Sequence, residues 1–221
     1  MSDILLHEVK GKSEIITFNN PNKLNVLSDE MLKLLLNALE KSSSNPKTKV
    51  VIIKSTGKAF CAGHDLKEMQ NARINSDDGI GYFKDLFKRC SKVMLKIKNL
   101  PKPVIAEVQG IATAAGCQLV ATCDIAIASK NASFGVNGVN IGLFCSTPMV
   151  ALSRNIGRKK TFEMLVTGDF LTANDAKEAG LVNHVTEENE LSNKTNEMKT
   201  SRLHFFFQLF LVCWSLLLWM G

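Results

Sequence analysis

Apolar and polar residues alternate in a way that predicts a strand, a helix and a second strand at the start of the chain. Residues 14–19 and 49–55 are short β-rich runs, and the second is almost continuous in apolar residues. Between them, apolar residues recur at helical spacing over residues 28–41, and Ser28 is a typical N-cap residue. A strand-helix-strand order requires a crossover connection, so we expect the two strands to pair in parallel.

The pattern further along the chain continues this alternation of helices and strands. The predicted elements are an amphipathic helix at 81–99, a strand at 104–108, a small-residue segment at 110–116 leading into a buried helix at 117–122, a strand at 124–129, and helices at 148–155, 159–166 and 173–179. No internal repeat of fixed period is visible. The pattern therefore predicts one α/β domain over residues 1–187.

The composition changes after residue 187. Residues 188–202 are polar and predict a linker, whereas residues 203–221 form an apolar tail in which only Gln208 and Ser215 interrupt the run Phe205 to Met220. As a helix this run would span about 24 Å, short of the ~30 Å hydrocarbon core of a membrane. Two interpretations remain: a membrane anchor, or the product of an alternative or truncated transcript with a non-homologous end. The short length favours the second.

Composition and charge exclude several classes of protein. The formal net charge is +6 and the sequence pI is about 9.0, but no basic run has aromatic neighbours. A nucleic-acid-binding protein would show a clustered basic stripe, so we expect no nucleic-acid partner. The six cysteines form no CxxC pair and no Cys/His cluster with zinc spacing, which predicts reduced thiols and no metal site. Neither a transit peptide nor a signal peptide is visible at the start of this chain.

Two segments could carry chemistry. Residues 57–68 directly follow a strand, and there Gly63 allows a tight turn while Asp65 can cap a helix that begins at Leu66. Residues 112–118 are rich in small side chains at the start of a helix. Both segments would leave backbone N–H groups able to bind a carbonyl oxygen or an oxyanion. Taken separately, each is also compatible with a plain strand-to-helix turn or a small-residue packing contact.

Taken together, these segments resemble the crotonase family, the enoyl-CoA hydratase/isomerase superfamily. The matching stretches are NPNKLNVLS at 20–28, AFCAGHDLKEM at 59–69, PVIAEVQG at 103–110, GCQLVATCDIA at 116–126 and LTANDAKEAGLV at 171–182. The resemblance implies an α/β, ClpP-like fold built of repeated ββα units. Members of the family form homotrimers through C-terminal helices, which the tail of this chain does not resemble.

The resemblance also implies a ligand and a site. Family members bind an acyl-CoA thioester as substrate, without a further cofactor, and hold its carbonyl oxygen between two backbone N–H groups, which here would belong to His64 and Ala115. The substrate-binding positions that it implies are Lys23, Val26, Ala62, His64, Asp65, Leu66, Lys67 and Ala115. Of these, Lys23 and Lys67 are candidates for the phosphates of coenzyme A. The family further implies a role in mitochondrial fatty-acid metabolism; a cytoplasmic or membrane-tethered location is the alternative.

The chain departs from the family at the two positions where hydratases carry catalytic glutamates. Gln118 stands at the first and Gly138 at the second, and no Asp or Glu occurs between Asp124 and Glu163. An amide does not titrate near neutral pH and glycine has no side chain, so neither can act as a general acid or base. We therefore expect weak or altered hydratase activity.

Three alternatives to this expectation stay open. His64 could titrate usefully if its side chain faces the pocket, which would give an active lyase or isomerase. Cys145 could act as a nucleophile, although a buried thiol in a packed loop is the simpler interpretation. The chain could also be a non-enzymatic, truncated or tail-anchored isoform.

Overall fold

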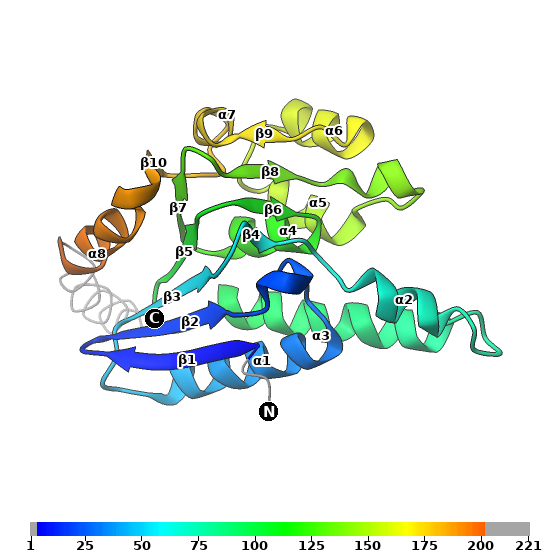
Figure 1. Ribbon diagram of the computed structural model, residues 1–221, viewed down its shortest axis with the longest axis horizontal. Coiled ribbons are helices and arrows are strands. Elements are labelled where there is room, and N and C mark those ends of the chain that lie inside the picture. The colour runs from blue at the N-terminus through cyan, green and yellow to red at the C-terminus, as the bar shows by residue number, and fades with distance from the viewer. Residues whose placement is uncertain (1–3, 202–221) are drawn as a thin grey trace, which may run out of the picture.

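Two sheets carry the fold of the protein, whose computed structural model describes residues 4–201 (Figure 1). In that range the larger sheet has the order β1-β2-β3-β5-β7-β10, and the smaller has the order β4-β6-β8-β9. The strands of the larger sheet are β1 (Leu5–Lys10), β2 (Ser13–Phe18), β3 (Val50–Ser55), β5 (Val104–Val108), β7 (Ile125–Ser129) and β10 (His184–Thr186). Those of the smaller sheet are β4 (Ala59–Cys61), β6 (Ile111–Thr113), β8 (Ser133–Gly135) and β9 (Leu171–Thr172).

The chain order shows a repeated ββα unit, which confirms the predicted fold class. In the pairs β3–β4, β5–β6 and β7–β8, the first strand joins the larger sheet and the second joins the smaller one. The helices that follow these pairs are α2 (Leu66–Ala72) and α3 (Ile80–Lys98), then α4 (Ala115–Thr122), then η2 (Asn137–Ile141) and α5 (Ser146–Leu152). Each unit therefore places a strand end of the smaller sheet next to a helix start, and these junctions build the site described below.

The first strand-helix-strand unit confirms the predicted parallel crossover. After a short 3-10 turn, η1 (Pro21–Lys23), helix α1 (Asp29–Ser44) connects β2 to β3, which pair in parallel from Ser13 opposite Val50. The Ser28 hydroxyl accepts a hydrogen bond from the backbone N–H of Met31, as an N-cap residue does. Strand β1, which pairs antiparallel with β2, was not predicted, because most of its residues are exposed and its hydrophobic alternation is weak.

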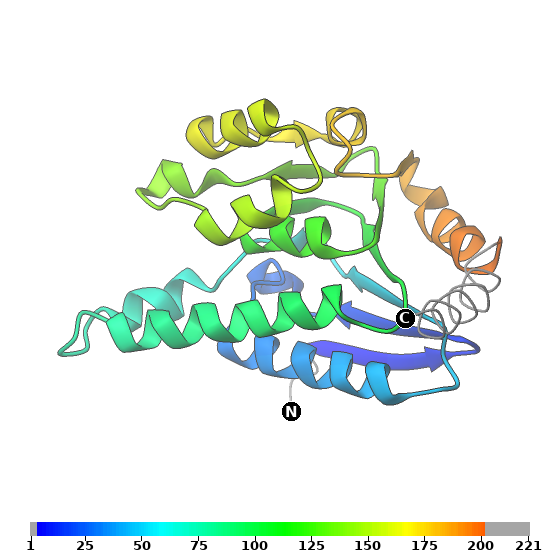
Figure 2. The ribbon, with the colours of Figure 1, turned by 180° about the vertical axis from the view of Figure 1, so that it is seen from behind.

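The two helices between residues 158 and 178 lie close to their predicted positions. Helix α6 (Arg158–Thr167) and helix α7 (Ala173–Glu178) pack near the smaller sheet (Figure 2). Helix α7 begins with a reciprocal capping box between Thr172 and Asp175. A Thr followed three residues later by an Asp is a sequence signal for the start of a helix, and α7 begins at this signal.

Residues 188–201 correct the predicted polar linker. They form a 3-10 turn, η3 (Glu188–Glu190), and helix α8 (Leu191–Ser201). Helix α8 covers one face of the larger sheet, where buried Leu191 packs with Ile15, Ile52 and their neighbours. Because successive strand residues point to opposite faces, Ile16 and Ile53 lie on the other face, in the main core with α1 and α3. Among residues 191–199 of α8, only Leu191 and Thr195 are buried, so the composition of the helix is polar.

One carboxylate is buried at the edge of the main core. Glu14 accepts hydrogen bonds from the Ser42 hydroxyl, the Thr48 hydroxyl and the His7 imidazole, and the buried Lys102 ammonium lies 3.6 Å from it. Burial alone would raise the pKa of Glu14, but these hydrogen bonds and the Lys102 charge outweigh it and lower the pKa to about 2. Glu14 is therefore ionised at neutral pH.

The predicted apolar tail, residues 203–221, lies outside the described residues. Over residues 4–201, helices of the length and apolarity needed to cross a bilayer are not found. The predictions of a membrane anchor through Phe205 to Met220 and of a non-homologous end therefore both stay predictions.

Candidate functional site

The loop between β4 and α2 is held against the segment before α1. The Ala62 N–H donates to the Leu24 carbonyl at 3.1 Å, and the Leu27 N–H donates to the Gly63 carbonyl at 2.7 Å. Gly63 has a φ of +89°, a left-handed conformation that suits glycine. These bonds fix the loop from both sides and orient the next peptide, whose N–H belongs to His64.

Asp65 closes this loop as the N-cap of α2. Its side chain is buried and accepts hydrogen bonds from the N–H groups of Lys67 at 2.9 Å and Glu68 at 3.4 Å. The predicted cap is therefore confirmed. Its carboxylate is used by the helix, which leaves the backbone of the loop as the part that can face a ligand.

The first turn of α4 supplies a second donor. Ala114 precedes the helix with a φ of +51°, which is unusual for a residue with a side chain, and its N–H donates to the Gly135 carbonyl at 3.0 Å. Ala115 is the first helical residue, so its N–H has no carbonyl within the helix to bind. The anchored Ala114 therefore sets the direction of the Ala115 N–H.

The two donor segments are neighbours. A Cβ atom placed on Gly63 would lie 2.9 Å from the Ala114 Cβ and 3.4 Å from the Ala115 nitrogen. Within the described part of the chain, neither the His64 N–H nor the Ala115 N–H has a hydrogen-bond partner. Two fixed, unoccupied N–H groups this close together form a site for a carbonyl oxygen or an oxyanion.

Both donor residues, His64 and Ala115, line one small cavity, here called the donor cavity, of about 260 Å³. Its walls are mostly apolar and come from the loop before α2, from α2, α3 and α4, and from the segment 137–148. The lining residues are Ala62, His64, Leu66, Met69, Phe87, Thr113, Ala114, Ala115, Asn137, Gly138, Ile141, Leu143, Phe144, Cys145, Ser146, Thr147 and Pro148. No Asp or Glu is among them.

The His64 side chain packs in the wall of this cavity. Its ring meets the Phe87 ring edge-on, with centroids 6.0 Å apart. Both ring nitrogens are buried and make no hydrogen bond of ordinary geometry in residues 4–201, although the Leu27 backbone lies close enough to act on the ring. Burial lowers the pKa of the imidazole, so the ring is neutral at pH 7. The backbone of His64, rather than its ring, is therefore the polar group presented by this residue.

Gly138 and Cys145 share one place in the cavity wall. A Cβ atom on Gly138 would lie 2.8 Å from the Cys145 Sγ and 2.8 Å from the Leu143 carbonyl oxygen. The loop therefore folds back on Gly138 so closely that it leaves no room for a side chain. Burial raises the pKa of the Cys145 thiol, which is consequently protonated at neutral pH.

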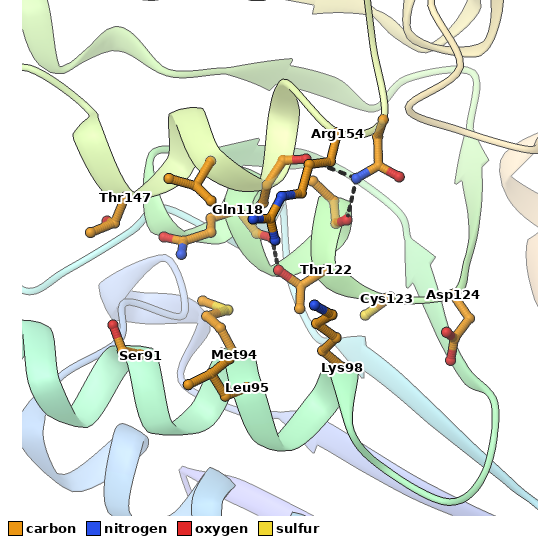
Figure 3. A pocket seen from close by; sticks show the side chains of 14 residues that line it. Ser91, Met94, Leu95, Lys98, Gln118, Thr122, Cys123, Asp124, Thr147 and Arg154 are labelled. Carbon is orange, nitrogen blue, oxygen red and sulfur yellow. Dashed lines mark hydrogen bonds between the residues drawn. The ribbon is translucent and has the colours of Figure 1, made fainter.

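Gln118 lies outside the donor cavity and faces a second one, the α3–α5 groove. This groove of about 550 Å³ is lined by side chains of α3, α4, α5 and the residues that follow α4 and α5. Figure 3 shows the Gln118 amide pointing into it, on the side on which Thr147 lies. Thr147 lines both cavities, so they adjoin there. The buried Gln118 Oε1 has no hydrogen-bond partner among the described residues.

The structure brings together only part of the predicted site. Ala62, His64, Leu66, Ala115 and Gly138 line the donor cavity. Four predicted substrate-binding residues do not: Lys23, Val26, Asp65 and Lys67. Of these, Lys23 in η1 and Lys67 in α2 are exposed, Val26 is half-buried, and Asp65 is the helix cap.

Sequence reasoning missed the apolar lining that other elements contribute. Phe87 comes from the middle of α3, and Phe144 from the loop before α5. The Thr113 hydroxyl donates to the Asn137 amide oxygen at 2.6 Å, which ties β6 to η2 beside the donors. The helical spacing of α3 includes Phe87, but no local signal tells which helix faces a distant loop.

Comparison with known proteins identifies the family whose sequences this chain matches. The family model described as "Enoyl-CoA hydratase/isomerase" matches residues 11–203. The protein named "Enoyl-CoA hydratase domain-containing protein 3, mitochondrial" is 44% identical over 194 residues in Danio rerio, covering 88% of this chain and 65% of that protein. Its human counterpart is 48% identical over 180 residues, covering 81% of this chain and 58% of that protein. The chain thus spans less than two thirds of these relatives.

Solved structures agree with this result. An enoyl-CoA hydratase from Mycobacterium smegmatis superposes with a TM-score of 0.85 at 48% identity, covering 90% of this chain and 76% of that one. Human enoyl-coenzyme A hydratase domain-containing protein 3 superposes with a TM-score of 0.83 at 45% identity, covering 88% and 75%. The predicted resemblance to the enoyl-CoA hydratase/isomerase family is therefore confirmed.

Proposed function

Because the chain belongs to the enoyl-CoA hydratase/isomerase family, we propose that it binds an acyl-CoA thioester with the carbonyl oxygen between the N–H groups of His64 and Ala115. The observation that carries the proposal is the pair of adjacent, unpartnered donors whose residues line an apolar cavity. Such donors stabilise the negative charge that develops on a thioester oxygen when an enolate forms, and loss of one typically costs about 3–4 kcal/mol of transition-state stabilisation.

The same cavity argues for weak or altered hydratase activity. Hydration of a 2-enoyl thioester requires a group that takes a proton from water and a group that delivers one to carbon. The donor cavity has no carboxylate, its thiol is protonated, and Gln118 does not titrate. The protein therefore polarises the thioester but lacks the two carboxylates that hydratases use, and the neutral His64 imidazole is the one titratable base left in the lining of the donor cavity.

The residues around the loop suggest where the remaining parts of the substrate bind. Lys23 and Lys67 are exposed on η1 and α2, which flank the loop that carries His64, and their charges suit the phosphates of coenzyme A. The Val26 N–H donates to the Lys23 carbonyl, and the Asp65 carboxylate accepts from the Lys67 N–H, so these two residues fix the backbone near both lysines. The relatives' names place those proteins in mitochondria, and we extend to this chain a mitochondrial role in fatty-acid metabolism.

A binding and turnover experiment tests this proposal. Calorimetric titration with butyryl-CoA, which cannot be hydrated, should show binding that free coenzyme A reproduces more weakly, because only the thioester has a carbonyl for the two donors. Turnover of crotonyl-CoA should be far below that of the short-chain-enoyl-CoA hydratase of Clostridium acetobutylicum in the same assay, a relative that is 33% identical over 202 residues. Family-like turnover would overturn the argument from the missing carboxylates.

Two matched variants isolate the donors. In Gly63→Ala the new Cβ would crowd Ala114 and push the donor segments apart, and we expect at least a tenfold loss of butyryl-CoA affinity. In Gly11→Ala the glycine also has a left-handed φ, of +61°, but nothing lies within 4 Å of the new Cβ, so affinity should persist. His64→Ala keeps the backbone N–H and should still bind. If it binds but loses all turnover, the imidazole takes part in catalysis.

A further inference from the structure

The α3–α5 groove combines apolar walls with two cationic side chains. Its walls include Met94, Leu95 and Val150, and the last two are exposed although they face a hollow. Lys98 ends α3 and Arg154 follows α5, so the two cations come from opposite walls. Figure 3 shows both head groups directed into the groove. An apolar hollow of this kind suits a ligand with an aliphatic part, and the cations suit a charged part.

These two cations lack an anionic partner in the part of the chain that the structure describes. Neither Lys98 nor Arg154 belongs to an ion pair there. The one carboxylate in the lining, that of Asp124, accepts a hydrogen bond from the Val104 N–H at 2.8 Å, and Figure 3 shows it apart from the cationic head groups. Two like charges that face one hollow repel each other and attract a counter-charge. This end of the groove therefore favours an anionic group.

A buried acceptor also faces the groove. Gln118 is 7% exposed, and its Oε1 has no hydrogen-bond partner among residues 4–201. Figure 3 shows the amide directed into the groove. Buried side-chain acceptors almost always have a donor, so the occupant should bring one. A water that hydrates an anionic group can donate one hydrogen to that group and the other to the Gln118 Oε1.

One face of α4 leads from the donor cavity to the cationic end of the groove. Ala115, Gln118 and Thr122 are spaced by three and four residues, so they share a face of the helix. Ala115 carries one of the two donors, and Thr122 lies near both cationic head groups in Figure 3. Seven residues of helix rise about 10 Å. Because the two cavities adjoin at Thr147, one ligand can extend from the donors to the cations.

Resting on the proposed function, we propose that the groove holds the acyl chain of a thioester that ends in a carboxylate, and that Lys98 and Arg154 bind this carboxylate. An extended chain advances about 1.2 Å per bond, as a polypeptide does at about 3.6 Å per three bonds. The distance of about 10 Å along α4 then corresponds to an acyl chain of roughly eight to ten carbons. The Arg154 guanidinium can bind a carboxylate with two parallel hydrogen bonds. The substrate class is thus a medium-chain acyl-CoA with a terminal carboxylate.

Two matched ligands test the proposal by calorimetric titration of the full chain. Octanoyl-CoA and suberoyl-CoA have acyl chains of equal length and differ only in a terminal methyl or carboxylate group. The test variant is Lys98→Gln/Arg154→Gln, and the matched control is Lys88→Gln/Arg158→Gln, which removes two exposed charges that do not line the groove. Net charge acts equally on the coenzyme A part of both ligands, so the ratio of their affinities reports the terminal group. Far-UV circular dichroism establishes that both variants are folded.

We expect the unmodified chain and the control to bind suberoyl-CoA about tenfold more tightly than octanoyl-CoA, and the groove variant to lose most of this preference. Equal affinities in the unmodified chain, or a preference that persists in the groove variant, would overturn the inference. The proposed function would still stand if octanoyl-CoA binds more tightly than free coenzyme A. If neither thioester does so, both fail. Free suberate that binds as tightly as suberoyl-CoA would also overturn the inference, because the cations would then hold a separate carboxylate.

Discussion

Gly138 shows how a single residue can be misjudged when only its side chain is considered. By its resemblance to the family, the sequence has this glycine where hydratases carry a catalytic glutamate. In the structure the Leu143 carbonyl and the Cys145 thiol occupy the space that a Cβ would need. The loop is therefore packed closely around the glycine, and a carboxylate at this position would require a different local backbone path.

Substitutions at Gly138 should consequently destabilise the protein. We expect Gly138→Ala to lower the free energy of unfolding by about 1–3 kcal/mol, because the added methyl group overpacks a closed loop. Gly138→Glu should be worse and should not restore hydration. Gly157→Ala is the control, since its Cβ would meet nothing within 4 Å and its φ is −56°. Urea unfolding measures all three, and an unaffected Gly138→Ala would contradict the packing argument.

Glu14 gives a prediction about pH. Its pKa is about 2 in the folded protein against 4.5 ordinarily, so its contribution to stability is complete above pH 4.5 and is lost as the pH falls through 2. The shift corresponds to about 3 kcal/mol. The difference in unfolding free energy between the unmodified protein and Glu14→Gln should therefore shrink by about that amount between pH 5 and pH 2.

The exposed Glu40 offers a control for this measurement. Glu40→Gln should follow the unmodified protein across the whole pH range in denaturant titrations. A Glu14→Gln variant whose deficit stays constant down to pH 2 would show that Glu14 is not held ionised by its neighbours.

At the scale of elements, the sequence predicts what is locally encoded and misses what depends on distant packing. The capped helix α1, the amphipathic helix α3 and the buried strands β3 and β5 carry strong periodic signals and lie close to their predicted bounds. Over residues 191–199, helix α8 buries only Leu191 and Thr195, so its sequence looks like a linker. Helix α8 is held in place because it packs against the second face of the larger sheet, and no local sequence pattern reveals that contact.

The stability of the protein should therefore depend on Leu191, the residue that anchors α8 to the larger sheet. Leu191 packs with Ile15, Ile52 and Ile127, and Leu191→Ala should lower the free energy of unfolding by about 2–5 kcal/mol because it leaves a cavity against the sheet. The neighbouring, exposed Asn193 provides the control variant Asn193→Ala, which should change stability by less than about 0.5 kcal/mol. Equal behaviour of the two variants in thermal unfolding would show that α8 is not docked.

At the scale of the whole molecule, the resemblance to the family predicted more of the site than the individual residues could. The two donor segments lie about fifty residues apart, and only the family pattern joined them before the structure placed Gly63 against Ala114. The apolar lining from α3 and the position of Gln118 in the adjoining groove needed the fold, because they depend on how separate units pack. The described part of the chain thus brings both donors to the donor cavity, whose lining contains no Asp or Glu.

The central claim is that a thioester carbonyl lies between the His64 and Ala115 N–H groups, and vibrational spectroscopy of that carbonyl tests it most directly. Isotope-edited infrared difference spectra would compare butyryl-CoA, labelled with ¹³C at the thioester carbonyl, free and bound to the full chain. Two hydrogen bonds weaken the C=O bond, so we predict a lower stretching frequency on binding and a smaller shift in Gly63→Ala. A ligand that binds with an unshifted carbonyl would contradict the account.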